Sequence, residues 1–210
     1  MTDLALDVSD GPAEAPVIKQ TGALLALPPS VPLVLDLDGT LIEGDLLYKS
    51  FFSIFRRNPA IVFSCALWLL RGRAVLKRQL ALRNRIDWDR LQFHQNVVTL
   101  AKHERSRGRR IILATAADAI LAGPAASFCP FIDQVFASDG ERNLKGSAKA
   151  ELLMRAFPGG FIYAGDSKSD LAVWARASGI VLVNVSASVR KAARAMGRPV
   201  LDLRGVKSLK

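Results

Sequence analysis

The chain has 210 residues, half of them hydrophobic, and a formal net charge of +10 at pH 7. This is enough for one domain with a real core and an inserted subdomain. The positive charge favours an anionic partner, either nucleic acid, an anionic membrane or a phosphorylated substrate. No nucleic-acid-binding motif is recognisable and only 7% of the residues are aromatic, so no nucleic-acid partner is expected.

Residues 1–30 mix Asp, Gly, Pro, Ser and Ala without sustained periodicity, which predicts a disordered leader. The leader lacks the basic start and compact apolar run of a secretory signal, so we expect a cytoplasmic protein. Cys65 and Cys129 both lie in apolar surroundings. They are interpreted as buried free thiols in a reducing compartment rather than as a disulfide or metal pair.

The apolar run Val31–Leu35 predicts a short buried strand at 32–37 that leads directly into Asp36 and Asp38. Residues i and i+2 of a strand point the same way, so both carboxylates could reach one pocket. Gly39 permits a sharp turn after them. Unpaired acids at the end of a core strand are costly unless another charge or a metal compensates them. Ligands of open α/β sheets bind at that edge.

The segment 41–107 has no clear strand and is long enough for several helices. Within it, the apolar run Pro59–Leu70 spans twelve residues, whereas a membrane-spanning helix needs about 20. Two interpretations stay open: a buried cap helix with solvated basic flanks, or an interfacial helix with Phe and Trp in lipid. The basic residues that would contact anionic headgroups are Arg56, Arg57, Arg71, Arg73, Lys77 and Arg78.

After Gly108, apolar runs alternate with helical patterns, which predicts an α/β fold with a Rossmann-like parallel sheet and right-handed crossovers. The expected strands are 32–37, 110–114, 133–136, 161–164, 180–184 and 199–202. The expected helices are 117–127, 146–156, 169–178 and 187–196. The arginines at 105, 107, 109 and 110 are expected on a solvated face.

Polar residues follow three of these strands in a fixed order. Asp36-Leu37-Asp38-Gly39-Thr40 comes first, then Thr115 at the end of the second strand, then Lys145, then Gly165-Asp166 with Asp170. This order resembles the haloacid dehalogenase (HAD) superfamily of phosphohydrolases over about residues 31–184. The resemblance implies a core of residues 31–40 and 108–210, with 41–107 forming a helical cap of the C1 type.

The resemblance also implies the roles of the site residues in a Mg²⁺-dependent phosphomonoesterase. Asp36 would be the nucleophile that forms an aspartyl-phosphate. Asp38 would be the general acid and then the base, and its backbone carbonyl would contact the metal. Asp36 and Asp166 would bind Mg²⁺, with Asp170 in support. The phosphate would be bound by Thr115 and Lys145, the latter chosen over Lys149 one helical turn later.

A narrower resemblance, carried by the run from DLDGTL through RRNP, LWLLRG, LATAAD and NLKG, is to a phosphatase-like domain fused to UbiA-type membrane prenyltransferases. It implies a place at the inner face of a bacterial inner membrane and a prenyl, lipid-linked or sugar phosphate as substrate. The aspartate-rich diphosphate motifs of the transferase are absent, so that activity is not implied. The alternatives are a membrane-associated partner domain of a prenyl-lipid pathway and a phosphomutase.

Overall fold

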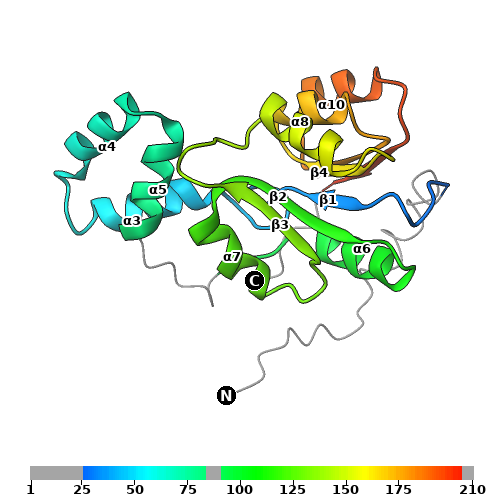
Figure 1. Cartoon of the computed structure of the whole chain (residues 1–210), viewed down its shortest axis with the longest axis horizontal. Coiled ribbons are helices and arrows are strands. Elements are labelled where there is room, and N and C mark those ends of the chain that lie inside the picture. The colour runs from blue at the N-terminus through cyan, green and yellow to red at the C-terminus, as the bar shows by residue number, and fades with distance from the viewer. Residues whose placement is uncertain (1–25, 84–90, 205–210) are drawn as a thin grey trace, which may run out of the picture.

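The computed structural model describes residues 26–83 and 91–204, and its centre is a six-stranded parallel sheet in the order β3-β2-β1-β4-β5-β6 (Figure 1). The α/β prediction is therefore confirmed. All six predicted strands are present. They are β1 (Leu33–Leu35), β2 (Ile111–Asp118), β3 (Gln134–Ser138), β4 (Ile162–Gly165), β5 (Gly179–Val183) and β6 (Val200–Leu203). β2 runs four residues past its predicted end at 114, so it takes in Thr115.

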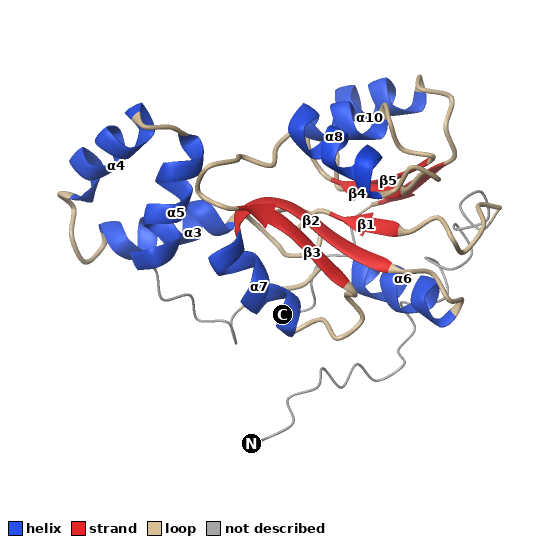
Figure 2. Cartoon of the chain, in the orientation of Figure 1, coloured by secondary structure: helices blue, strands red, loops and turns tan. Residues whose placement is uncertain are grey.

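Helices cover both faces of the sheet, which separates the core into two layers (Figure 2). α6 (Gln95–Ser106) and α7 (Ala119–Ser127) pack on one face. α8 (Ser147–Ala156), α9 (Leu171–Trp174) and α10 (Ala187–Arg194) pack on the other. Because both faces are covered, the strands are nearly continuous apolar runs, as in other doubly covered parallel sheets.

The helix predicted at 169–178 is shorter than expected. A single 3₁₀ turn, Lys168–Asp170, comes first, and α9 then ends at Trp174. The start of this turn has a capping box, in which the Ser167 side chain and the Asp170 side chain each bond to the other's backbone N–H. Asp170 is therefore a structural cap as well as a candidate site residue.

A separate helical lobe stands beside the carboxyl ends of the strands (Figure 1). It consists of α3 (Leu46–Phe55), α4 (Ile61–Leu70) and α5 (Arg73–Arg83). The predicted cap of 41–107 needs correction at its far end, because Val97, Leu100 and Ala101 of α6 are buried against the sheet. The predicted disordered leader of residues 1–30 also needs correction at its end, because Arg109 donates hydrogen bonds to the backbone carbonyls of Leu27 and Pro28.

Arg109 corrects the expectation of a solvated basic face. Its side chain is only 1% exposed, and its guanidinium forms an ion pair with Glu104. It also donates to the backbone carbonyls of Leu27, Pro28 and Val31. A planar guanidinium has five N–H donors, so one side chain can bond several acceptors just before β1, of which the Val31 carbonyl is buried. This cross-link fixes where the first strand enters the sheet.

None of the helices within 26–83 and 91–204 is long and apolar enough to cross a membrane.

Replacing Arg109 with Met should lower the free energy of unfolding by about 3 kcal/mol or more, because it leaves the buried Glu104 carboxylate and the buried Val31 carbonyl without their main donor. Urea unfolding of both proteins measures the change. The neighbouring Arg110→Met is the control, since Arg110 is exposed and its side chain donates a hydrogen bond to the exposed Gln134. Equal midpoints for the two variants would contradict a structural role for Arg109.

Candidate active site

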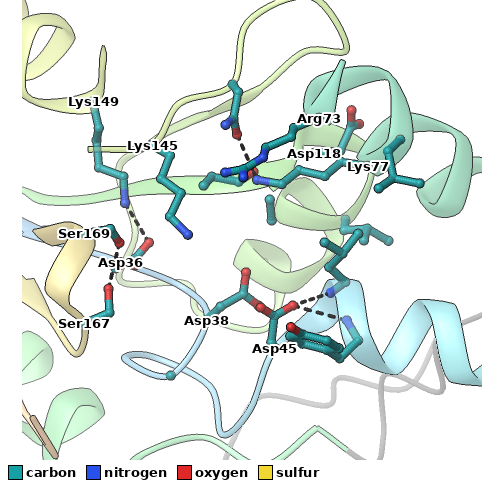
Figure 3. A pocket seen from close by; sticks show the side chains of 18 of the residues that line it. Asp36, Asp38, Asp45, Arg73, Lys77, Asp118, Lys145, Lys149, Ser167 and Ser169 are labelled. Carbon is teal, nitrogen blue, oxygen red and sulfur yellow. Dashed lines mark hydrogen bonds and ion pairs between the residues drawn. The ribbon is translucent and has the colours of Figure 1, made fainter. Parts of the chain in front are cut away.

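A pocket of about 590 Å³ lies between the carboxyl edge of the sheet and the helical lobe (Figure 3). The core lines it from the ends of three strands, with Asp36 after β1, Asp118 at the end of β2 and Asp166 after β4. The lobe lines it with apolar and basic side chains of α3, α4 and α5. Four of the six predicted site residues, Asp36, Asp38, Lys145 and Asp166, line this pocket.

Asp36 forms an ion pair with Lys149, whose Nζ lies 2.9 Å from its Oδ1 (Figure 3). Lys149 is nearly fully buried and its Nζ also donates to the Tyr163 hydroxyl at 2.7 Å. Burial raises the pKa of Asp36, and the Lys149 cation opposes that rise. Lys149, the alternative to Lys145, therefore makes the contact with Asp36, while Lys145 lines the pocket and is exposed, so phosphate binding by Lys145 stays a prediction.

The choice between the two lysines depends on the start of α8. Lys145 precedes the helix, whereas Lys149 lies in its first turns with Ala150 and Leu153 on the buried face. The side chain of Lys149 therefore reaches Asp36 through the core. In sequence, the two positions are one helical turn apart and carry the same residue type, so local pattern could not separate them.

Carboxylate oxygens of Asp36, Asp166 and Asp170 lie within 4.8 Å of one another. Burial raises the pKa of Asp166 to about 7, and the charges of Asp170 and Asp36 add to the rise. A cluster of this kind is unfavourable unless a cation is present. A few carboxylates around an open pocket suit Mg²⁺, which keeps several water ligands and takes further oxygens from a phosphate. The donor set therefore fits the predicted metal.

Asp170 differs from the other two carboxylates because hydrogen bonds already occupy both of its oxygens. Oδ2 accepts from the backbone N–H groups of Asp166 and Ser167 and from the Ser167 hydroxyl, while Oδ1 accepts from the Tyr163 hydroxyl. Gly165 leaves room for this carboxylate, since a Cβ there would lie 2.8 Å from the Asp170 carboxyl group. These contacts hold the chain around Asp166 and Ser167 in place, while a supporting role of Asp170 at the metal stays a prediction.

The carboxylate of Asp38 connects the core to the lobe. Its Oδ1 accepts a hydrogen bond from the backbone N–H of Leu46, the first residue of α3, at 2.8 Å. Burial raises the pKa of Asp38 to about 7, although the Leu46 bond partly opposes the rise. An acid with a pKa near neutrality can both give and take a proton, which is what a general acid–base group needs.

The structure places Thr115 inside β2 instead of at its end. Its side chain is fully buried, and its hydroxyl accepts a hydrogen bond from the backbone N–H of Ala117 at 2.9 Å. The next three residues in the chain, Ala116, Ala117 and Asp118, line the pocket. Phosphate binding by Thr115 therefore stays a prediction.

The sequence analysis missed the contribution of α5. Lys77 donates to the Ala116 carbonyl at 2.7 Å and to Asn143 Oδ1 at 2.9 Å. Arg78 lies 3.3 Å from the buried carboxylate of Asp118. In the interfacial interpretation of this segment both residues would contact lipid headgroups, and this part of it is corrected because both side chains bond to the core. No local signal marks them, since only the packing of α5 over β2 brings them there.

No protein-family model matches the chain. An uncharacterized protein of Sinorhizobium fredii is 37% identical over 178 residues, which are 85% of this chain and 34% of that protein. The chain therefore spans about a third of the length of this curated relative.

Several solved structures share the fold. A protein of unknown function from Bordetella pertussis has a TM-score of 0.61 at 17% identity, covering 81% of this chain and 97% of that one. A HAD family hydrolase from Salmonella enterica serovar Typhi has a TM-score of 0.59 at 13% identity, covering 80% and 66%. A phosphoserine phosphatase captured as a phospho-aspartyl intermediate analogue has a TM-score of 0.55 at 14% identity, covering 81% and 92%.

These identities show the fold alone: the chain has the same fold as the HAD family hydrolase and the phosphoserine phosphatase. None of the proteins named above is described as a prenyltransferase, so the narrower resemblance stays a prediction.

Gly39→Ala should disturb the carboxylate cluster, because a Cβ at Gly39 would lie 2.2 Å from Oδ2 of Asp166. Gly39 has φ +72, a conformation that costs a side chain roughly 1–2 kcal/mol. Gly108→Ala is the matched control: Gly108 has φ +83, but nothing lies within 4 Å of its Cβ position. Both variants should lose similar backbone stability, while only Gly39→Ala should lose thermal stabilisation by Mg²⁺. Equal stabilisation of both by Mg²⁺ would contradict this account.

Proposed function

We propose that this chain is a Mg²⁺-dependent phosphomonoesterase that works through an aspartyl-phosphate on Asp36. The observation that carries the proposal is the position of Asp36: its carboxylate lies in a pocket, paired with Lys149 and within 4.8 Å of carboxylate oxygens of Asp166 and Asp170. The fold of HAD hydrolases supports it. The phosphoserine phosphatase named above carries a phospho-aspartyl analogue, which is the intermediate that this chemistry requires.

The proposed reaction has two steps, each of which uses groups of this chain. Asp36 attacks the phosphorus while Asp38 gives its proton to the departing alcohol oxygen. Asp38 then takes a proton from a water that attacks the phosphorus, which releases phosphate and restores Asp36. Lys149 holds the Asp36 carboxylate in place, and Lys145 is the candidate cation for the phosphate oxygens. Asp36, Asp166 and the Asp38 carbonyl would hold Mg²⁺, which would neutralise the carboxylates and polarise the phosphoryl group.

The lining of the pocket supports a small substrate that combines phosphate with a less polar part. Basic side chains from both the lobe and the core, including Arg73, Lys77 and Lys145, share the wall with apolar ones. The apolar members are Leu47, Tyr48, Leu69, Leu76 and Leu121. A lipid-linked phosphate would use both kinds of contact, whereas a sugar phosphate would leave much of the apolar wall without a partner. A panel of prenyl, sugar and amino-acid phosphates would separate these substrates.

The two other functions predicted from sequence can be tested by the same panel. A phosphomutase would keep its aspartyl-phosphate and return the phosphoryl group to a second hydroxyl, so it would release little inorganic phosphate. A partner domain without catalysis would release none. The complete set of Asp36, Asp38, Asp166 and Lys149 in one pocket favours hydrolysis over loss of catalysis.

Asp36→Asn should abolish turnover while the fold survives, because it removes the attacking carboxylate and keeps the shape. The loss should be at least about three orders of magnitude. Release of p-nitrophenol from p-nitrophenyl phosphate in the presence of Mg²⁺ measures it, and urea unfolding checks the fold. The matched control is Asp139→Asn, an acid on an exposed loop whose carboxylate bonds to its neighbours Glu141 and Arg142. Residual activity near that of the parent would rule out Asp36 as nucleophile.

Asp166→Asn should abolish the stabilisation of the protein by Mg²⁺. A ligand at about 100 times its dissociation constant stabilises a protein by about 2.7 kcal/mol. Thermal unfolding with and without Mg²⁺, and after addition of a chelator, tests this independently of any substrate. Asp139→Asn again serves as the control and should keep the response. If Asp166→Asn is stabilised by Mg²⁺ as much as the parent, the ion binds elsewhere.

A further inference from the structure

The outer side of the helical lobe is an unexplained apolar surface. Of the ten residues of α4, only Ile61 is buried. Phe63 is 79% exposed, Leu67 63% and Leu70 85%. The buried cluster inside the lobe has only Ile54, Ile61 and Leu80 as fully buried members. The interpretation of α4 as a buried cap helix therefore does not hold, because most of this helix faces away from its neighbours.

The exposed side chains of α4 form one continuous stripe. Helical residues three and four apart lie on the same face, so Val62, Ala66 and Leu69 form one row. Phe63, Leu67 and Leu70 form a second row beside it, and all six residues are exposed. The stripe contains no polar side chain. We define the α4 surface as these six residues.

Positive charge surrounds the α4 surface. Arg56 and Arg57 precede α4 and Arg71 follows it, and all three are exposed. The lobe between Leu46 and Arg83 contains no Asp or Glu, so nothing within it neutralises these cations. Two other basic residues of the lobe, Lys77 and Arg78, are bonded toward the core. Within the lobe, the cations at the two ends of α4 therefore have no acid to pair with, which suits them to an anionic partner.

We propose that the α4 surface docks on an anionic phospholipid membrane, with α4 lying in the plane of the interface. An apolar stripe with cations at both ends matches acyl chains beneath a layer of anionic phosphates. A helix of ten residues is about 15 Å long, half the thickness of the hydrocarbon core, so it can lie on the bilayer but not cross it.

A second copy of the chain fits the same surface less well. A two-fold interface brings identical patches together, so arginines at the ends of one α4 would meet arginines of the other. No acid of the lobe is available to pair with them. Charge complementarity therefore selects an anionic partner over self-association.

The α4 surface reaches the pocket. Leu69 belongs to the α4 surface and also lines the pocket. Tyr48 of α3 and Arg73 of α5 line the pocket as well, and both are exposed. Docking through α4 would bring the pocket wall next to the lipid headgroups. The docking proposal does not depend on the proposed function, because it rests on the outer face of the lobe and is tested without a substrate.

The test is co-sedimentation of the full chain with vesicles of phosphatidylcholine alone and of phosphatidylcholine mixed with phosphatidylglycerol. The parent protein should bind the mixed vesicles and be released by high salt, which screens the arginine contacts. Combined Arg56→Gln, Arg57→Gln and Arg71→Gln should lower the partition coefficient about 100-fold, since each cation near an anionic leaflet contributes about fivefold. Combined Phe63→Ser, Leu67→Ser and Leu70→Ser should lower it at least about tenfold.

Each variant has a matched control. Arg155→Gln, Arg176→Gln and Arg198→Gln remove the same charge from exposed sites on the core, and Val135→Ser with Met154→Ser removes exposed apolar groups there. Both controls should bind like the parent, and urea unfolding should show all variants folded. A parent that stays in the supernatant with every vesicle overturns the proposal. So does equal loss in the arginine control, which would reflect net charge alone, or a parent dimer broken by the α4 variants without vesicle binding.

Discussion

Three carboxylates lie close together at the carboxyl edge of the sheet, and the contacts around them offset the electrostatic repulsion between them. Asp36, Asp166 and Asp170 are brought together because β1 and β4 are neighbours in the sheet. Lys149 supplies a buried cation beside Asp36, and the Tyr163 hydroxyl joins Lys149 to Asp170. These contacts compensate only part of the negative charge, so burial still raises the pKa of both Asp36 and Asp166. The negative charge that remains uncompensated makes the pocket suited to a divalent cation and a phosphate.

The helical lobe completes this arrangement from the other side of the pocket. The first backbone N–H of α3 bonds Asp38, and two basic residues of α5, Lys77 and Arg78, reach acceptors at the end of β2. The lobe is thus tied to the core through polar contacts at the pocket as well as through Leu46 and Ala81, which belong to the main apolar core. Lids with such contacts can exclude water and select substrates when they move. Any displacement of the lobe would change the hydrogen bond on Asp38, so the position of the lobe is linked to the group that we propose as general acid and base.

The inner and outer sides of the lobe have opposite character. Its inner side carries cations that compensate the acidic sheet edge, whereas the α4 surface is apolar and faces away from the lobe's small buried cluster. This division follows from the lobe's size: three short helices bury few residues, so one helix keeps an exposed apolar face. The same helices therefore serve the pocket on one side and present a docking surface on the other.

The sequence by itself determined the strands, their order with the helices, and the acids that follow β1 and β4. These features depend on local patterns, because a short apolar run followed by Asp marks a strand end wherever the strand lies. Only the tertiary structure shows that Lys149 pairs with Asp36, that Arg109 is buried, that α6 belongs to the core and that Lys77 and Arg78 bond to the end of β2. Each of these depends on how a helix is rotated and packed against residues far away in the chain. Lysine and arginine occur both on solvated faces and in buried pairs, so only their packed surroundings distinguish the two.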